Sequence, residues 1–295
     1  MSSRALRVAL VTRRYCWGTA ESPGSYSKEI LVNADELMVE AQDRIRENRA
    51  RQVTFTVRES EGKVVPNAMV RARLTRHAFG FGCNAFPIHH LEDETVQEAY
   101  GQRFAELLNY ATLPFYWGGY APTPNSTLES NRHAMAAWCT EHNIVAKGHP
   151  LVWHEVFPAW AADKPDAEML ARLEARVRHD VAAFRGEVDI WDVINEATVA
   201  ANFNNAVGRW VGQHGAAACV ESALSWAHEA NPEATLLYND FNISSAFEQV
   251  VTGLQAHRAP VHALGLQSHM HKGVIPLEEI WQRCEAYARF GLPLH

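Results

Sequence analysis

From residue 79 onward, short apolar runs alternate with longer segments in which apolar residues recur at helical spacing. The short runs are typical of buried parallel strands, and the longer segments are typical of helices that cover a sheet. We predict six strands, at 79–83, 108–113, 144–149, 188–195, 234–240 and 261–269. We predict helices between them that include 94–107, 128–142, 168–184, 216–230 and 277–290.

This repeated order of strand and helix predicts an α/β fold with a parallel sheet. At 295 residues the leading form is a (β/α)8 TIM barrel. We expect the barrel to be incomplete, with strands one to six and the start of strand seven at 291–295. A doubly wound sheet is the alternative, but no Gly-x-Gly-x-x-Gly follows a predicted strand.

The pattern is different ahead of residue 79. Residues 1–50 form a predicted N-terminal arm, without a clean period over 1–30 and with a helix over 33–48. Over 51–78 apolar and polar residues alternate on both sides of a Glu61-Gly62 turn signal, which predicts a small antiparallel β extension. The main domain then covers residues 79–295.

Composition excludes several classes of partner. The chain has 27 Lys plus Arg against 34 Asp plus Glu, a net charge of −7, so it has no strong basic field for nucleic acid. Apolar runs stay well below the roughly 20 residues of a membrane span, and no signal peptide is readable. Five scattered cysteines without a Cys-x-x-Cys pair indicate neither a zinc knuckle nor a disulfide framework. We predict no cofactor and no resident metal.

Polar side chains gather where the predicted strands end. In a barrel these ends converge on one mouth, where active sites are built. A single Asn or His at a strand end commonly satisfies backbone groups, but the same feature on five strands predicts one site. The residues concerned are Asn84, His149, Asn195, Glu196, Asn239, Asp240, Gln267 and His269.

The stretch Trp191–Ala197 is the most informative of these strand ends. It is an apolar run that delivers an amide and a carboxylate, so Asn195 and Glu196 are the first catalytic candidates, although Asn-Glu could also cap a helix. The chain has nine tryptophans, and indole faces stack on sugar rings as well as filling cores. We interpret Trp191 as core, and Trp153 and Trp160 as cleft surface.

The four stretches that contain most of these strand ends, at 148–154, 191–197, 238–242 and 265–269, resemble in sequence and in order the blocks of glycoside hydrolase family 10, the endo-1,4-β-xylanases. The resemblance covers about residues 79–295 and implies an endo-acting, retaining hydrolase of β-1,4-xylosidic bonds, with xylan or a related β-1,4-glycan as substrate. It also implies an extracellular or periplasmic location. The blocks are Gly148–His154 (GHPLVWH), Trp191–Ala197 (WDVINEA), Tyr238–Asn242 (YNDFN) and Gly265–His269 (GLQSH).

The resemblance implies that Glu196 is the acid/base and that Asn195 is the amide that holds the 2-hydroxyl of the sugar. A retaining glycosidase needs two carboxyl groups roughly 5 Å apart, one that protonates the leaving oxygen and one that attacks the anomeric carbon. A carboxyl group beside a second carboxylate in a Trp-lined cleft keeps its proton through repulsion and desolvation.

By the same resemblance, His149 and Trp153 line the subsite of the sugar to be cleaved. Gln267 and His269 resemble the sixth-strand pair, in which the histidine hydrogen-bonds the nucleophilic carboxylate. We assign Asp192, Asn239 and Asp240 to supporting hydrogen bonds. Asn84 and Trp160 complete the predicted substrate-binding residues.

The sequence departs from the family where the nucleophile is expected. The nucleophilic Glu belongs at the end of strand seven, which residues 291–295 only begin. Glu278, Glu279 and Glu285 lie in the preceding predicted helix. We therefore expect a fragment without its nucleophile, and negligible xylanase activity from residues 1–295 alone.

A second departure concerns the neighbouring sugar subsite. Where the family carries Glu, Asn and Lys around the end of strand two, this chain has Thr112, Leu113 and Tyr116, and Val156 stands where a Gln is usual. Fewer polar groups should weaken hydrogen-bonded recognition of that sugar while stacking stays possible. We expect the preferred chain or decoration to shift.

Two other functions remain open from the sequence. His269 and His271 form a His-x-His pair that would suit a metal-dependent hydrolase on a barrel, although no matching ligands cluster elsewhere. A catalytically inactive carbohydrate-binding fragment or degenerate homologue is the more serious alternative, because the nucleophile is not found.

Overall fold

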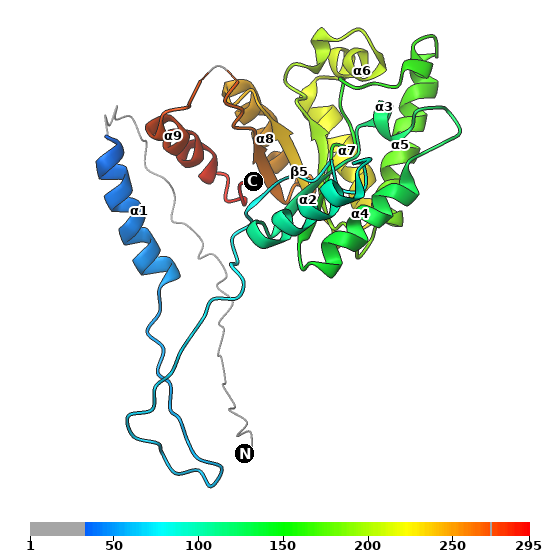
Figure 1. Cartoon of the computed structure of the whole chain (residues 1–295). Coiled ribbons are helices and arrows are strands. Elements are labelled where there is room, and N and C mark those ends of the chain that lie inside the picture. Colours follow the sequence, from blue (N-terminus) through cyan, green and yellow to red (C-terminus); the bar gives the residue numbers. More distant parts are fainter. Residues whose placement is uncertain (1–32, 272) are drawn as a thin grey trace. The chain divides into compact units, whose positions relative to one another are not determined.

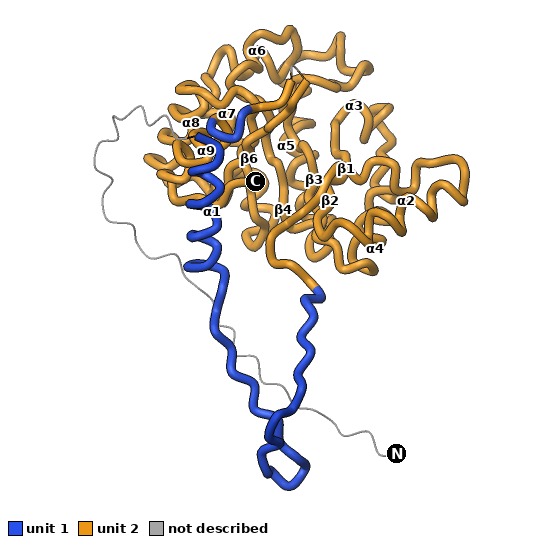
Figure 2. Tube along the Cα trace, turned by 60° about the vertical axis from the view of Figure 1, so that its left-hand side comes forward, with its two compact units in different colours: residues 1–75, 276–278 blue, residues 76–275, 279–295 orange. Residues whose placement is uncertain are grey.

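The computed structural model describes residues 33–271 and 273–295. The chain divides into two compact units, residues 1–75 with 276–278 and residues 76–275 with 279–295, which Figure 2 colours separately. The arm predicted over residues 1–30 lies outside the described residues.

Helix α1, Ala34–Arg49, belongs to the first unit. Asn33 caps it, because its side-chain oxygen accepts a hydrogen bond from the backbone N–H of Glu36 at 3.0 Å. Asp35 and Glu36 also place negative charge in the first turn, which the helix dipole favours. The helix predicted over 33–48 is confirmed.

The strand pair predicted over residues 51–78 is wrong. A turn forms, flanked by a single antiparallel bridge between Arg58 and Val64, but no strand runs on either side of it in this described segment. Val53, Phe55 and Leu74 are 59%, 46% and 75% exposed. A two-stranded ribbon needs another layer over its apolar face, and these side chains bury no such face.

The second unit is built on one sheet of six parallel strands in the order β1-β2-β3-β4-β5-β6. Each strand overlaps a predicted one, so the six predicted strands are confirmed. The sequential order excludes the doubly wound alternative, in which the strand order reverses. The strands are Gly82–Asn84 (β1), Tyr110–Pro114 (β2), Val145–His149 (β3), Ile190–Asn195 (β4), Thr235–Asp240 (β5) and Ala263–Leu266 (β6).

Helices separate consecutive strands along the chain (Figure 1). Five were predicted: α2 (Glu94–Leu107), α4 (Glu129–Glu141), α5 (Asp166–Ala183), α7 (Ala216–Ala230) and α9 (Leu277–Ala288). The structure adds α3 (Trp117–Tyr120), α6 (Ala206–His214), α8 (Ser245–Ala256) and two 3₁₀ turns, Ala159–Ala161 and Ala200–Asn202. No helix in the described residues is long and apolar enough to cross a lipid bilayer.

Trp191 lies at the centre of the core with no exposed surface, as predicted. Its ring contacts the ring of Phe115 edge-on, with centroids 4.8 Å apart. Gly148 on the neighbouring strand leaves room for this indole, because a Cβ at position 148 would overlap the Trp191 ring. The glycine of the GHPLVWH block therefore lets β3 and β4 pair over a buried tryptophan.

The sheet is curled. After α9, Leu294 forms a parallel bridge with Leu264 of β6, and His295 exchanges backbone hydrogen bonds with the same strand. The imidazole of His295 also lies 3.3 Å from the hydroxyl of Tyr110, on β2. A segment paired to β6 thus reaches β2, and the unit has the architecture of an open, incomplete (β/α)8 barrel with residues 293–295 where the seventh strand would enter.

Candidate active site

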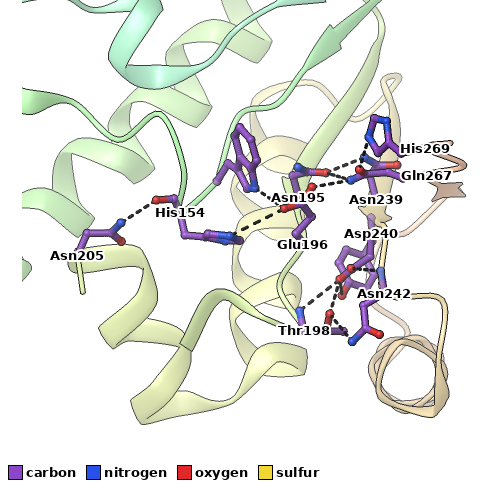
Figure 3. Close-up of polar contacts among 12 residues, drawn as sticks. His154, Asn195, Glu196, Thr198, Asn205, Asn239, Asp240, Asn242, Gln267 and His269 are labelled. Atoms are coloured by element: carbon purple, nitrogen blue, oxygen red, sulfur yellow. Dashed lines mark hydrogen bonds and ion pairs between the residues drawn. The ribbon is translucent and has the colours of Figure 1, made fainter. Parts of the chain in front are cut away.

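Three amide side chains meet at the ends of β4, β5 and β6 (Figure 3). The Nδ2 of Asn239 donates to Oδ1 of Asn195 at 2.6 Å, and Nε2 of Gln267 donates to the same oxygen at 2.8 Å. His269 Nε2 lies 2.9 Å from Oε1 of Gln267. Four of the residues predicted at strand ends therefore form one connected group.

Gly265 allows this approach of β5 and β6, since a Cβ at position 265 would overlap the side chain of Asn239. The glycine of the GLQSH block has the same role beside β5 that Gly148 has beside β4. Both motif glycines are thus explained by close packing between neighbouring strands.

Glu196 follows β4 directly and turns its carboxylate toward this group. Its backbone has φ 57°, a left-handed conformation that is uncommon for a residue with a side chain, and its N–H donates to the carbonyl of Asn239 at 2.8 Å. Nε1 of Trp153 donates to Oε2 at 2.9 Å, and Gln267 donates to Oε1 at 3.0 Å. Glu196 is 8% exposed, so its carboxylate is held firmly by these bonds and keeps a small accessible surface.

Asp192, on the same strand, lies in a charged cluster. Its Oδ2 is 2.7 Å from Nζ of Lys147 and 2.7 Å from Nδ1 of His149. Burial acts to raise the pKa of this carboxyl, but Lys147 and then His149 outweigh burial and lower the pKa to about 2. The pairing of β4 with β5 shifts register just after this residue, between Asp192 and Ile194.

Asp240 stabilises the loop that follows Glu196. Its Oδ2 accepts from the hydroxyl of Tyr238 at 2.7 Å and from the hydroxyl of Thr198 at 2.9 Å, and its Oδ1 accepts from the backbone N–H of Asn242 at 2.9 Å (Figure 3). Asp240 has no exposed surface. These bonds hold the β4 and β5 loops together without reaching Glu196.

Three predicted substrate-binding residues lie outside the connected group: His149, which is hydrogen-bonded to Asp192, Asn84 and Trp160. Asn84 ends β1 with an exposed side chain, and its carbonyl accepts from the hydroxyl of Tyr100 at 3.3 Å. Nε1 of Trp160 donates to the carbonyl of Ala121 at 2.9 Å, and its ring contacts Trp117. Their roles stay predictions.

Three residues of the site were not predicted from the sequence. Lys147 compensates Asp192, and its signal was a lysine in the middle of a buried strand. His154 and Glu155 follow Trp153 and bring their ligand atoms, with those of Glu196, within 4.8 Å of one another. Burial lowers the pKa of His154 to about 4, so its ring is neutral at pH 7. Glu155 is exposed and gave no signal in the sequence.

Comparisons with known proteins agree on one family. The model of glycosyl hydrolase family 10 matches residues 115–295. Endo-1,4-beta-xylanase B of Thermotoga neapolitana is 33% identical over 165 residues, which are 52% of this chain and 46% of the relative. Beta-1,4-xylanase of Dictyoglomus thermophilum is 35% identical over 136 residues, 44% of this chain and 38% of the relative. The chain therefore spans about half the length of these relatives or less.

Solved structures give the same result. Xylanase 10B of Thermotoga petrophila RKU-1, in complex with xylobiose, matches with a TM-score of 0.61 and 28% identity over 73% of this chain and 67% of that one. Native xylanase 10B of Thermotoga maritima matches with a TM-score of 0.62 and 27% identity over 73% of this chain and 68% of that one.

Proposed function

The chain belongs to glycosyl hydrolase family 10, and from this premise we propose that it is part of an enzyme, an endo-acting, retaining hydrolase of the β-1,4-xylosidic bonds of xylan. The observation that carries the proposal is the group formed by Asn195, Glu196 and Gln267 at the ends of neighbouring strands. Because the chain spans about half the length of the curated relatives, the activity of the whole protein is part of the proposal.

In the proposed mechanism Glu196 moves the proton. It gives a proton to the glycosidic oxygen while a second carboxylate attacks the anomeric carbon, so that the C–O bond breaks and a glycosyl-enzyme ester forms. It then takes a proton from the water that hydrolyses this ester, which restores both carboxyl groups. Trp153 and Gln267 hold one carboxylate oxygen each and thereby fix its direction.

The hydrogen bonds around Asn195 and His149 leave specific atoms for the sugar. Oδ1 of Asn195 already accepts two hydrogen bonds, so its Nδ2 is the atom left to donate to a hydroxyl of the substrate. Nδ1 of His149 is bound to Asp192, which leaves Nε2 for the substrate. Tyr116 contacts the rings of both His149 and Trp153, at centroid distances of 5.4 and 5.5 Å. Aromatic rings therefore lie beside the two polar atoms that are left for the substrate, Nδ2 of Asn195 and Nε2 of His149.

The nucleophile expected after strand seven stays a prediction. The N–H of Leu266 donates to the carbonyl of His295 at 2.8 Å, so residue 295 lies level with the end of β6. By family resemblance, His269 is the residue that would hydrogen-bond this carboxylate.

The preferred glycan follows from the apolar surface at the end of β2. Tyr116 and Val156 line a cavity of about 190 Å³ together with Pro114, Gly119, Tyr120 and Arg132. We propose that this surface favours a decorated or otherwise altered backbone unit over a plain xylose, because few hydrogen-bonding groups are present to recognise bare hydroxyls. Binding of decorated xylans more tightly than of linear xylo-oligosaccharides or glucan is the expected order.

The test is binding of xylotriose, linear and decorated xylans and a β-1,4-glucan to the purified chain, measured by calorimetry. Asn195→Ala should weaken binding about 10-fold, the equivalent of one to two lost hydrogen bonds. Gln102→Ala is the matched control, since it removes an exposed amide from α2. Absence of binding to xylans and to glucan, or equal affinity of both variants, would contradict the proposal.

Turnover separates the enzyme from the inactive alternative. If an aryl β-xylobioside is hydrolysed, Glu196→Gln should lower kcat/KM by about 10²- to 10⁴-fold, the usual contribution of a general acid. Such turnover by residues 1–295 would also contradict the expectation that the nucleophile is absent. If the unmodified chain and Glu196→Gln both bind xylan and neither hydrolyses the aryl β-xylobioside, the result favours the carbohydrate-binding alternative.

A further inference from the structure

Three ligand-bearing side chains converge beside the cleft, from two different loops. His154 and Glu155 lie on the loop after β3, and Glu196 lies at the end of β4. One imidazole nitrogen and one oxygen from each carboxylate all lie within 4.8 Å of one another. In the part of the chain that the structure describes, this is the only group of three or more His, Cys, Asp or Glu side chains arranged in this way.

His154 supplies an independent indication that a ligand belongs here. Its side chain has no exposed surface, and neither ring nitrogen makes a hydrogen bond. Buried polar groups are almost always paired, so an imidazole without a partner needs an explanation. Nε2 is directed at Glu196 and lies 3.9 Å from its Oε2, which is too far for a hydrogen bond (Figure 3).

The imidazole is held in this direction by its surroundings. The ring packs on Phe203 with centroids 3.9 Å apart, and Nδ2 of Asn205 donates to the carbonyl of His154 at 2.7 Å. The carboxylate of Glu196 is likewise oriented by Trp153 and Gln267. Two of the three ligands are therefore preorganised, while the third, Glu155, is exposed.

We propose that His154, Glu155 and Glu196 form a binding site for a divalent transition-metal ion such as Zn²⁺. An imidazole with two carboxylates is a ligand set that suits zinc, whereas Mg²⁺ and Ca²⁺ prefer oxygen ligands alone. Ligands about 2.0 to 2.2 Å from a tetrahedral ion lie about 3.3 to 3.6 Å apart. The 3.9 Å between His154 and Glu196 has to close by only a few tenths of an ångström.

Metal binding and catalysis would compete for Glu196. A metal ion on Oε2 occupies the oxygen that the general acid needs for its proton, so zinc should inhibit the hydrolase. This consequence rests on the proposed function, but the binding site does not. The test therefore measures binding, and a failure to bind metal leaves the proposed hydrolase untouched.

The experiment is titration of the purified chain with ZnCl₂ by calorimetry, followed by titration with CoCl₂, whose visible absorption reports the coordination. One ion per chain is expected, with no displacement by excess Mg²⁺. Glu155→Gln, which changes an exposed residue, should weaken zinc binding at least 10-fold, and His154→Gln should weaken it further. Circular dichroism and a melting curve establish that each variant is folded.

The control is His271→Ala, which removes one ring of the His269–His271 pair and leaves His269 on Gln267. The two rings stack with centroids 4.8 Å apart and are exposed, so they are the most evident competing site for zinc. The control should bind zinc as the unmodified chain does. Loss of binding in the control, unchanged binding by folded Glu155→Gln, or no binding by the unmodified chain would overturn the proposal.

Discussion

Strand β4 and the residue directly after it carry two acidic side chains, Asp192 and Glu196, in contrasting surroundings. Asp192 is fully buried and lies 2.7 Å from both Lys147 and His149. Glu196 retains 8% exposure. In the described chain its hydrogen bonds come from the indole of Trp153 and the amide of Gln267, which carry no charge.

The different surroundings point to different roles for the two carboxylates, a structural one for Asp192 and a chemical one for Glu196. Charge compensation lowers the pKa of Asp192 to about 2 and ties β3 to β4. Uncharged donors orient Glu196 without neutralising it, which is the setting that the proposed acid/base and cation-binding roles require. We interpret Asp192 as the support and Glu196 as the working group of the site.

The largest expected difference between substitutions of Asp192 and of Glu196 is in folding stability. Asp192→Asn should lower the free energy of unfolding by about 3–5 kcal/mol, because it leaves the largely buried Lys147 ammonium without a counter-charge. Glu196→Gln keeps the shape of the side chain and should change that free energy by less than about 1 kcal/mol. Urea unfolding followed by circular dichroism measures both. Equal losses would erase the distinction between the two carboxylates.

Acid should reduce the contribution of Asp192 to the free energy of unfolding. The pKa of Asp192 is lower in the folded chain, about 2, than the ordinary value near 4, so the unfolded chain takes up the proton first. Its contribution to stability is thus complete above about pH 4 and is lost as pH falls toward 2, by roughly 2–3 kcal/mol. The measurement is the difference between unfolding free energies of the unmodified chain and Asp192→Asn across this range. A difference that stays constant below pH 4 would show that Asp192 is not the group that titrates.

The sequence predicted the sheet well because strand interiors carry their own signal. Runs such as the one ending at Asn195 are apolar enough to be recognised without knowledge of their neighbours. The same reasoning failed at Val53 and Phe55, where an alternating pattern has no surface to cover. It also left α8 unpredicted, although Phe247, Val250 and Leu254 of that helix are buried.

The site was predicted only as far as motifs reach. Asn195, Glu196 and Gln267 could be placed together because strand ends converge in a barrel. The partnership of Lys147 with Asp192 depends on the register of two strands, and the position of Glu155 depends on the path of a loop. A local pattern of residues predicts neither the register of two strands nor the path of a loop.

A third prediction tests whether strand spacing maintains the charged cluster. Gly148→Ala places a methyl group against Trp191, and we expect a loss of about 1–3 kcal/mol from overpacking. Lys147 and His149 flank this position, so their bonds to Asp192 should lengthen while those of Glu196 stay in place. The acid-sensitive part of the stability should shrink in this variant. The matched control is Gly119→Ala, because a Cβ there meets no atom within 4 Å.

The smallest expected effect is the coupling between Glu196 and its indole donor. Trp153→Phe and Trp160→Phe each remove one partly buried N–H donor, from bonds of 2.9 Å in both cases, and each should cost about 0.5–1.5 kcal/mol of stability. Their acceptors differ, since Trp160 donates to a backbone carbonyl and Trp153 donates to Glu196.

A double-mutant cycle with Glu196→Gln separates the two tryptophans. It should give a coupling energy of about 0.5–1 kcal/mol for Trp153 and close to zero for Trp160. Equal couplings would mean that the indole of Trp153 does not act through Glu196. A coupling with Trp153 of about 3 kcal/mol or more would be the size found for a broken buried ion pair. Glu196 would then be as firmly tied as Asp192, and the distinction between support and working group would not hold.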